Sequence, residues 1–170
     1  MVCELRAVIL RGPRYARAPQ DDGLGFEIEM TLYFAYGSNM DGAHMARMCP
    51  RAKAYGPARI KHYRFFVTAS GHGSIAPHRG ANLWGVLWRV TAVDVAALDR
   101  YEDVGGGLYG RENLPVHYDE KLLIALVYIA TDATPGRASP RYRAQVIGAA
   151  REWKLPDDYV SALERAFGPE

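Results

Sequence analysis

The order of strand-like and helix-like segments is the feature that most constrains the fold of this chain. Short runs rich in aromatic and branched residues predict strands at 31–36, 58–68, 83–90, 111–117 and 122–130. Helical spacing and capping residues predict helices after Ser38, after Thr91, after Ser139-Pro140 and from about Pro156 to Phe167. The two kinds of element are mixed without regular alternation. We therefore expect an α+β domain with a mixed, curled, barrel-like sheet and surrounding helices.

The size and charge of the chain exclude several partner classes. Its 170 residues fit one domain of ordinary size, and 49% hydrophobic residues supply a sizeable core. With 21 Lys and Arg against 19 Asp and Glu, the charge is too balanced to indicate binding to nucleic acid or an anionic membrane. The longest apolar run, Leu122 to Ala130, has the length of a strand and is too short to span a bilayer. The sequence does not indicate an oligomeric state.

Two further features concern the compartment and the domain boundary. The two cysteines, Cys3 and Cys49, are too few and too far apart for a disulfide framework, so we expect a reducing, cytoplasmic compartment. Residues 1–29 are rich in Pro, Gly and Arg without a sustained period. We expect them to be a disordered extension, or the result of an upstream start with Met30 as the working start. The domain would then be 30–170.

The stretch FAYGSNM, residues 34–40, ends an apolar strand and leads directly into a predicted helix. Gly37 permits close approach of a ligand to the backbone, and Ser38 or Asn39 is expected to cap the helix. Amide N–H groups at such a corner form a cradle for anionic groups. The alternative interpretation is a connecting turn between a strand and a helix that binds no ligand.

Glu102 breaks the apolar pattern of its helix. Val95 and Leu98 define an apolar face that Glu102 extends, and Asp94 and Asp99 are expected to point elsewhere. A carboxyl group that faces a core has a raised pKa, which suits a general base or acid near neutral pH. The alternative is a solvated side chain in the last helical turn that pairs with Arg100 or Arg111.

Other candidate features are weaker. His72 and His78 lie in a Gly-rich segment, 69–82, that we expect to be a long loop, and their spacing is not a compact metal signature. No metal site is predicted. Gly85 within the strand 83–90 marks either a bulge or a close approach of another backbone. The aromatic residues Tyr33, Phe34, Trp84 and Trp88 are interpreted as core.

Four blocks of sequence together resemble one family. They are YGSNM at 36–40, LWGVLWRV at 83–90, LDRYEDV at 98–104 and SPRYRAQVIGAAREWKLPDDYVSAL at 139–163. Their order and spacing are similar to those of the γ-glutamylcyclotransferase family, also called AIG2-like, from about Leu32 to Leu163. The Gly105-Gly106-Gly107 run is looser than usual for the family.

The resemblance implies a reaction and a set of site residues. Such enzymes convert a small γ-glutamyl compound into 5-oxoproline and a free amine or amino acid, without a cofactor, within glutathione metabolism. The catalytic glutamate of the family falls on Glu102. Its substrate-binding positions fall on Tyr36, Gly37, Ser38, Asn39, Tyr109, Tyr128 and Tyr142.

Three functions remain open at this point. The first is a cofactor-free cyclotransferase whose leaving group is an amino acid, a peptide, an ε-lysine or an amine. The second is a non-catalytic module that binds small γ-glutamyl or carboxylate ligands on the same fold. The third is a zinc-dependent hydrolase that uses His72 and His78.

Overall fold

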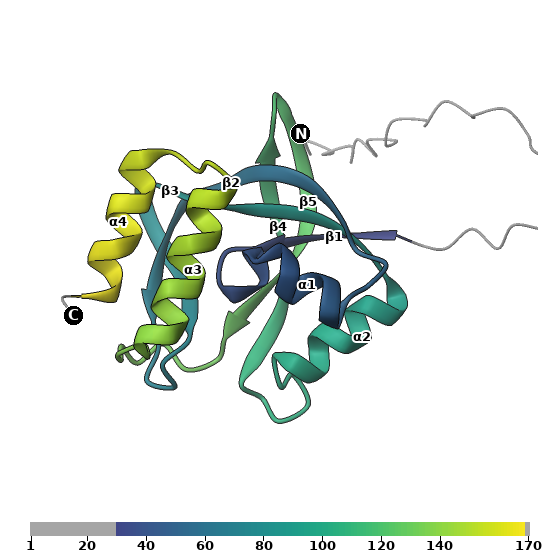
Figure 1. Ribbon diagram of the computed structural model, residues 1–170, viewed down its shortest axis with the longest axis horizontal. Coiled ribbons are helices and arrows are strands. Elements are labelled where there is room, and N and C mark those ends of the chain that lie inside the picture. The colour runs from purple at the N-terminus through teal and green to yellow at the C-terminus, as the bar shows by residue number, and fades with distance from the viewer. Residues whose placement is uncertain (1–29, 169–170) are drawn as a thin grey trace, which may run out of the picture.

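The described residues form a closed barrel of five strands, in the order β1-β3-β2-β4-β5 (Figure 1). The structure is a computed structural model that describes residues 30–168. The strands are β1 (Met30–Ala35), β2 (Lys53–Val67), β3 (Gly73–Thr91), β4 (Tyr109–Tyr118) and β5 (Lys121–Ala130). Pairing is antiparallel except where β1 meets β5 in parallel, at Tyr33 and Leu126. The expected mixed, barrel-like sheet is confirmed, whereas the expected extension, 1–29, lies outside the described residues.

Helices pack around the barrel. Between residues 30 and 168 they are the short 3-10 turn η1 (Ser38–Met40), α1 (Gly42–Met48), α2 (Ala92–Tyr101), α3 (Pro140–Glu152) and α4 (Asp157–Phe167). In Figure 1, α3 and α4 lie together on one side of the barrel, while α1 and α2 lie toward the other end. Strand β1 is therefore buried on both faces at Tyr33, Phe34 and Ala35. One face of such a strand points into the barrel and the other is covered by helices.

The segment expected to be a long loop, 69–82, is mostly strand. Residues from Gly73 onward belong to β3, and Ile75 is buried opposite Phe65 of β2. The pairing shifts between Lys61 and Tyr63, so that residues 78–81 face His62 alone. His62 has a φ of 65°, and its Nδ1 accepts a hydrogen bond from the amide of Gly80. The loop prediction was wrong because Pro77 pairs with Tyr63 in the ladder and the bulge at 78–81 absorbs Gly80 without ending the strand.

The corner after β1 also differs from the expected helix start. Ser38 and Asn39 do not cap α1 but form the 3-10 turn η1, in which both are buried. Asp41 is the N-cap of α1, where its carboxylate accepts from the amides of Ala43 and His44. The Ser38 and Asn39 side chains are therefore available for other contacts.

Helix α3 holds this corner in place. Gln145 donates to the Asp41 carboxylate over 3.0 Å, and the Trp153 indole donates to the backbone carbonyl of Met40 over 2.7 Å. Val146 and Ala149 of α3 are buried in the core. Gln145 of α3 and its C-cap Trp153 thus fix the position of the corner that follows β1.

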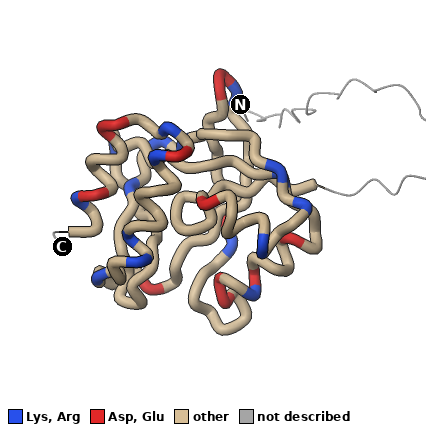
Figure 2. Tube along the Cα trace, viewed as in Figure 1, with Lys and Arg blue, Asp and Glu red and all other residues tan. Residues whose placement is uncertain are grey.

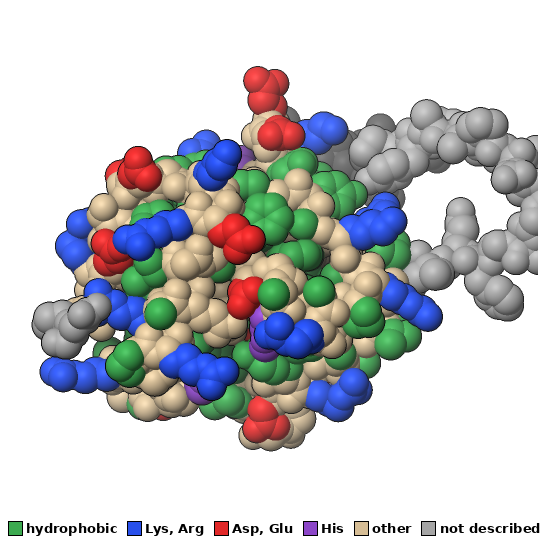
Figure 3. Space-filling model, in the orientation of Figure 1, with side chains coloured by type: hydrophobic (Ala, Val, Ile, Leu, Met, Phe, Trp, Pro, Cys, Tyr) green, Lys and Arg blue, Asp and Glu red, His purple; other side chains and the backbone are tan. Residues whose placement is uncertain are grey.

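Charged residues of both signs are spread over the whole described chain (Figure 2). On the face shown in Figure 3 they are interspersed with apolar side chains, without a large region of one sign. Within residues 30–168, none of the helices has the length and apolar content that crossing a bilayer requires. The mixed charges of this surface therefore agree with the nearly equal numbers of basic and acidic residues in the sequence.

Gly85 marks a close approach of two backbones. It pairs with Ala58 in regular register, so there is no bulge at this position. A Cβ atom on Gly85 would lie 2.2 Å from the carbonyl oxygen of Ala35 and 2.7 Å from the Phe34 ring. Only glycine lets β1 lie this close to β3 just before the corner.

We expect Gly85→Ala to lower the free energy of unfolding by about 1–3 kcal/mol, because the new methyl group overpacks the β1–β3 contact. Gly148→Ala is the matched control, since Gly148 lies in α3 with no atom within 4 Å of the added Cβ. There alanine should raise the free energy by about 0.5–1 kcal/mol through helix propensity. Urea unfolding measures both, and equal effects at the two glycines would contradict this account.

Candidate active site

A cavity of about 170 Å³ opens where the β1 corner, the end of α2, the start of β3 and helix α3 meet. All eight residues that the sequence assigned to the site line it: Tyr36, Gly37, Ser38, Asn39, Glu102, Tyr109, Tyr128 and Tyr142. Five lining residues were not assigned: Tyr33, His72, Gly73, Tyr101 and Leu108. The fold thus brings together residues from seven helices and strands (β1, η1, β3, α2, β4, β5 and α3) and from the loops between them.

Glu102 is the acidic group of this cavity. It ends α2 as its C-cap, and its backbone amide still donates to the carbonyl of Leu98 over 2.8 Å. Its carboxylate accepts a hydrogen bond from Asn39 Nδ2 over 2.9 Å. Burial raises the pKa of Glu102 to about 7, and the hydrogen bond from Asn39 opposes part of that rise. A carboxyl group with this pKa exchanges protons readily near neutral pH.

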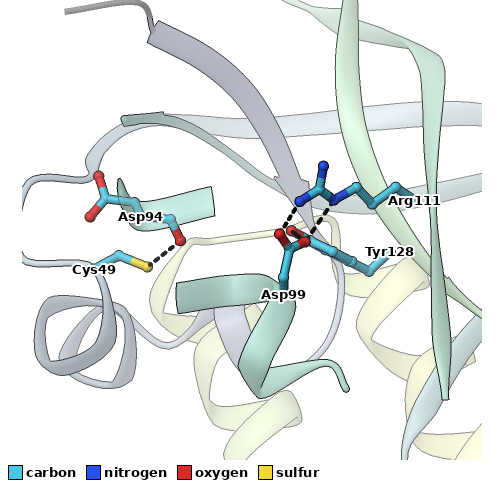
Figure 4. Close-up of polar contacts among 5 residues, drawn as sticks. All are labelled: Cys49, Asp94, Asp99, Arg111 and Tyr128. Carbon is cyan, nitrogen blue, oxygen red and sulfur yellow. Dashed lines mark hydrogen bonds and ion pairs between the residues drawn. The ribbon is translucent and has the colours of Figure 1, made fainter. Parts of the chain in front are cut away.

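The ion pair considered for Glu102 does not form in the described part of the chain. Arg111 instead makes a two-pronged ion pair with Asp99, one turn earlier on α2. Asp99 was expected to point elsewhere, but it is half-buried, and Tyr128 also donates to it, over 2.8 Å (Figure 4). Sequence reasoning missed Asp99 because its partners lie on β4 and β5, far along the chain.

The inner face of α2 differs in one further respect. Leu98 is buried and Val95 half-buried, as expected, but Asp94 is buried too. Asp94 forms a capping box with Thr91, and its backbone carbonyl accepts from the Cys49 thiol (Figure 4). Its carboxylate is satisfied by the Thr91 amide and hydroxyl, which is why it tolerates burial.

Asn39 links Glu102 to β1. Its Nδ2 donates both to Glu102 and to the hydroxyl of Tyr33, each over 2.9 Å. Tyr33 was interpreted as core, and it is buried, but it also lines the cavity. The two acceptors together fix the plane of the Asn39 amide, and so the direction from which this amide donates to Glu102.

Two tyrosines hold the Gly73 peptide against the corner. Tyr109 donates to the Gly73 carbonyl over 2.7 Å, and the Gly73 amide donates to the Tyr142 hydroxyl over 2.9 Å. A Cβ atom on Gly37 would lie 2.9 Å from the same Tyr142 oxygen, so a larger residue there would displace the Tyr142 hydroxyl. The first residue of β3 thereby becomes part of the cavity wall.

Five tyrosine hydroxyls of the cavity, those of Tyr33, Tyr36, Tyr109, Tyr128 and Tyr142, have raised pKa values and stay protonated at neutral pH. Burial is the main cause in every case, and it raises the pKa of Tyr128 to about 12. It also raises the pKa values of Tyr33, Tyr36, Tyr109 and Tyr142, and the charge of Glu102 raises them further. The cavity thus combines one titratable carboxyl group with several neutral hydroxyls.

Apart from Tyr33, which was interpreted as core, the lining residues that sequence reasoning missed fall into two groups. Tyr101 and Leu108 are each the immediate neighbour of an assigned residue, Glu102 or Tyr109, and that adjacency was a usable signal. His72 and Gly73 lay in the segment expected to be a loop, and no local pattern tied them to the site.

The histidine pair considered for zinc is not assembled here. His72 lines the cavity, whereas His78 is exposed at the β2–β3 bulge. Among residues 30–168, no three histidine, cysteine, aspartate or glutamate side chains are grouped so that they could hold a metal ion.

Comparisons with known proteins match this architecture. The sequence profile of the family described as "Gamma-glutamyl cyclotransferase, AIG2-like" matches residues 33–154. The chain belongs to this family of enzymes. The mouse γ-glutamylcyclotransferase is 31% identical over 82% of this chain and 80% of its own length. The human γ-glutamylcyclotransferase is 30% identical over 84% of this chain and 82% of its own length.

A solved structure of a γ-glutamyl cyclotransferase has 27% sequence identity and a TM-score of 0.76, and covers 84% of this chain and 90% of its own. The resemblance seen in the sequence is therefore confirmed. The family match, 33–154, runs from the end of β1 through α3, and every cavity-lining residue lies within it.

The pH dependence of stability tests the buried state of Glu102. Its folded pKa, about 7, lies above its ordinary value of 4.5, so the folded protein binds this proton more tightly than the unfolded chain. The resulting penalty on folding is absent below pH 4.5, grows as the pH rises and is complete above pH 7. Glu102→Gln keeps an acceptor for Asn39 and does not titrate. It should be more stable than wild type by about 3 kcal/mol at pH 8, with little difference at pH 4.5.

Urea unfolding at the two pH values measures this difference, with Glu112→Gln as the exposed control on β4. If the difference in the free energy of unfolding between Glu102→Gln and wild type is the same at both pH values, folding does not raise the pKa of Glu102.

Proposed function

We propose that the chain is a cofactor-free γ-glutamylcyclotransferase with Glu102 as its proton-transfer group. One observation carries the proposal: a half-buried carboxyl group, whose pKa desolvation raises to about 7, faces a cavity beside the Gly37–Asn39 corner. The names of the mouse and human relatives support the same activity. A cytoplasmic location and a role in glutathione metabolism stay predictions.

The proposed reaction closes a five-membered lactam. The α-amino nitrogen of the γ-glutamyl group attacks its own γ-carbonyl carbon, a new C–N bond forms, and the bond from that carbon to the leaving nitrogen breaks. The α-nitrogen loses a proton to Glu102, and the leaving nitrogen gains one from it. The products are 5-oxoproline and a free amine, and no water, oxidant or cofactor is consumed.

Glu102 suits both halves of this proton transfer. A substrate α-amine is mostly an ammonium at neutral pH and must lose a proton before it can attack. A carboxylate of raised pKa accepts that proton and then, as the carboxylic acid, delivers it to the departing amine. The hydrogen bond from Asn39 orients the carboxyl group throughout.

In this proposal, the corner residues bind the negatively charged groups of the substrate. The amide N–H groups of 37–39 receive either the α-carboxylate or the oxygen on which charge develops as the ring closes. The hydroxyls of Tyr36, Tyr109, Tyr128 and Tyr142 shape the wall that keeps the substrate folded. Holding an intramolecular nucleophile in position contributes on the order of 7–11 kcal/mol to such a reaction.

A non-catalytic binding module is the second candidate. Binding alone needs Glu102 only as an ionised partner for the α-ammonium of a zwitterionic γ-glutamyl ligand, and an ordinary carboxylate of low pKa would serve that purpose better. The raised pKa of Glu102 is therefore a cost to pure binding and an asset to proton transfer. Wild-type protein that binds γ-glutamyl compounds without releasing 5-oxoproline would establish the binding module instead.

Replacing Glu102 by glutamine should lower kcat for 5-oxoproline release by about 100- to 10,000-fold, the usual contribution of a general base. In the wild type, kcat/KM should rise with pH through about 7, because the base acts only when it is deprotonated. That rise should be absent from the residual activity of the variant. Product release from γ-glutamyl amides between pH 5.5 and 8.5 gives both quantities.

Glu112→Gln is again the matched control and should keep wild-type rates and the wild-type pH profile, since Glu112 is exposed outside the cavity. If Glu102→Gln turns over at the wild-type rate, Glu102 is not the base.

A further inference from the structure

The residues that line the cavity grade from a buried floor to an exposed mouth. Tyr33, Tyr36, Asn39, Tyr109 and Tyr128 are all buried. Three lining residues are instead exposed: His72, Tyr101, with 46% of its surface accessible, and Leu108, with 36%. The mouth therefore consists of an imidazole, a phenol ring and a branched alkyl group.

The mouth residues are held by contacts of their own. The Tyr101 hydroxyl lies 3.2 Å from Ser38 Oγ, and its ring centroid lies 5.0 Å from that of His44. The His72 ring meets Tyr142 edge to face at 5.3 Å. Large apolar side chains that remain exposed beside a cavity are typical of a ligand contact. Rings with fixed positions bind a flat or apolar group at little entropic cost.

The direction of the substrate follows from the proposed function, on which this inference rests. The zwitterionic end of the γ-glutamyl group needs the polar floor, where Glu102 and the Gly37–Asn39 corner lie. The nitrogen that departs must lie within reach of Glu102, and its substituent continues outward to the mouth. The chemistry of the mouth thus selects the leaving group.

We infer that the preferred substrate is a γ-glutamyl amide whose leaving amine carries an uncharged, apolar substituent, such as an aryl-alkyl group. The substituent packs against Leu108 and Tyr101 while the γ-glutamyl group fills the floor.

The charges near the cavity favour an amine over an α-amino acid. The carboxylate of a leaving amino acid would sit one carbon from the reacting nitrogen, and therefore close to Glu102, whose like charge repels it. Arg111, on β4 just beyond Tyr109, is engaged by Asp99 in a two-pronged ion pair. The described residues that line the cavity include neither lysine nor arginine.

Three substrates test the inference: γ-glutamyl ethylamide, γ-glutamyl phenethylamide and γ-glutamylphenylalanine. In the wild type, kcat/KM for the phenethylamide should exceed that for the ethylamide by about tenfold, as burial of part of a phenyl ring predicts. It should also exceed that for γ-glutamylphenylalanine, which differs from the phenethylamide only by the carboxylate.

Leu108→Ala should reduce the phenethylamide-to-ethylamide ratio by about fivefold, because the phenyl ring loses its aliphatic partner. Leu122→Ala is the matched control, since Leu122 is an equally apolar, 60% exposed leucine on β5 outside the cavity, and it should leave the ratio unchanged. Circular dichroism checks that both variants are folded.

The outcomes separate this inference from the proposed function. Release of 5-oxoproline from none of the substrates would overturn the proposed function. Release at equal kcat/KM from the two amides, or an unchanged ratio in Leu108→Ala, would overturn the apolar leaving group alone. Faster turnover of γ-glutamylphenylalanine than of the phenethylamide would overturn the preference for an uncharged amine.

Discussion

The hydrogen bond from Asn39 to Glu102 joins two parts of the chain that are 63 residues apart, and the site depends on it. Asn39 lies in the turn after β1, and Glu102 ends a helix that follows β3. The bond is 2.9 Å long and partly buried, and it can form because Gly85 lets β1 lie directly against β3, so that both elements reach the same end of the barrel. Without that contact, the carboxyl group would end a helix in solvent, with an ordinary pKa.

The rest of the fold supports this pair from several directions. Tyr33 accepts the second amide hydrogen of Asn39, and α3 donates to Met40 and Asp41 on the other side of the turn. These contacts span large separations in sequence, and they convert a short turn into a rigid wall. A proton-transfer group gains from such rigidity, because the distance to the reacting nitrogen must hold through two successive transfers.

The sequence allowed most of the fold and the centre of the site to be predicted, for reasons that are local. Alternation and caps marked β1, α2 and α3, and the break in the apolar face of α2 singled out Glu102. The errors concern features that depend on pairing. The bulge opposite His62 hid the start of β3, and with it His72 and Gly73, because glycines within a strand resemble a loop. Asp99 was misplaced because its polar partners, Tyr128 and Arg111, meet it only in the folded barrel. Asp94 was misplaced although its partner Thr91 is local, because helical periodicity does not count the capping box that satisfies its carboxylate. Periodicity describes one element at a time and does not register such contacts.

Burial also explains how one carboxyl group can serve as both base and acid in the proposed reaction. Transfer of a proton from the substrate ammonium to Glu102 converts an ion pair into two neutral groups. In water the ion pair is strongly favoured, because the ordinary pKa of a carboxyl group is far below that of an amine. Desolvation raises the pKa of Glu102 and lowers that of a buried ammonium, so the two states approach each other in free energy. The Asn39 amide limits this rise, since it favours the ionised carboxylate. A more complete burial would leave Glu102 permanently protonated, and a more exposed position would leave it too weak a base to release the attacking nitrogen.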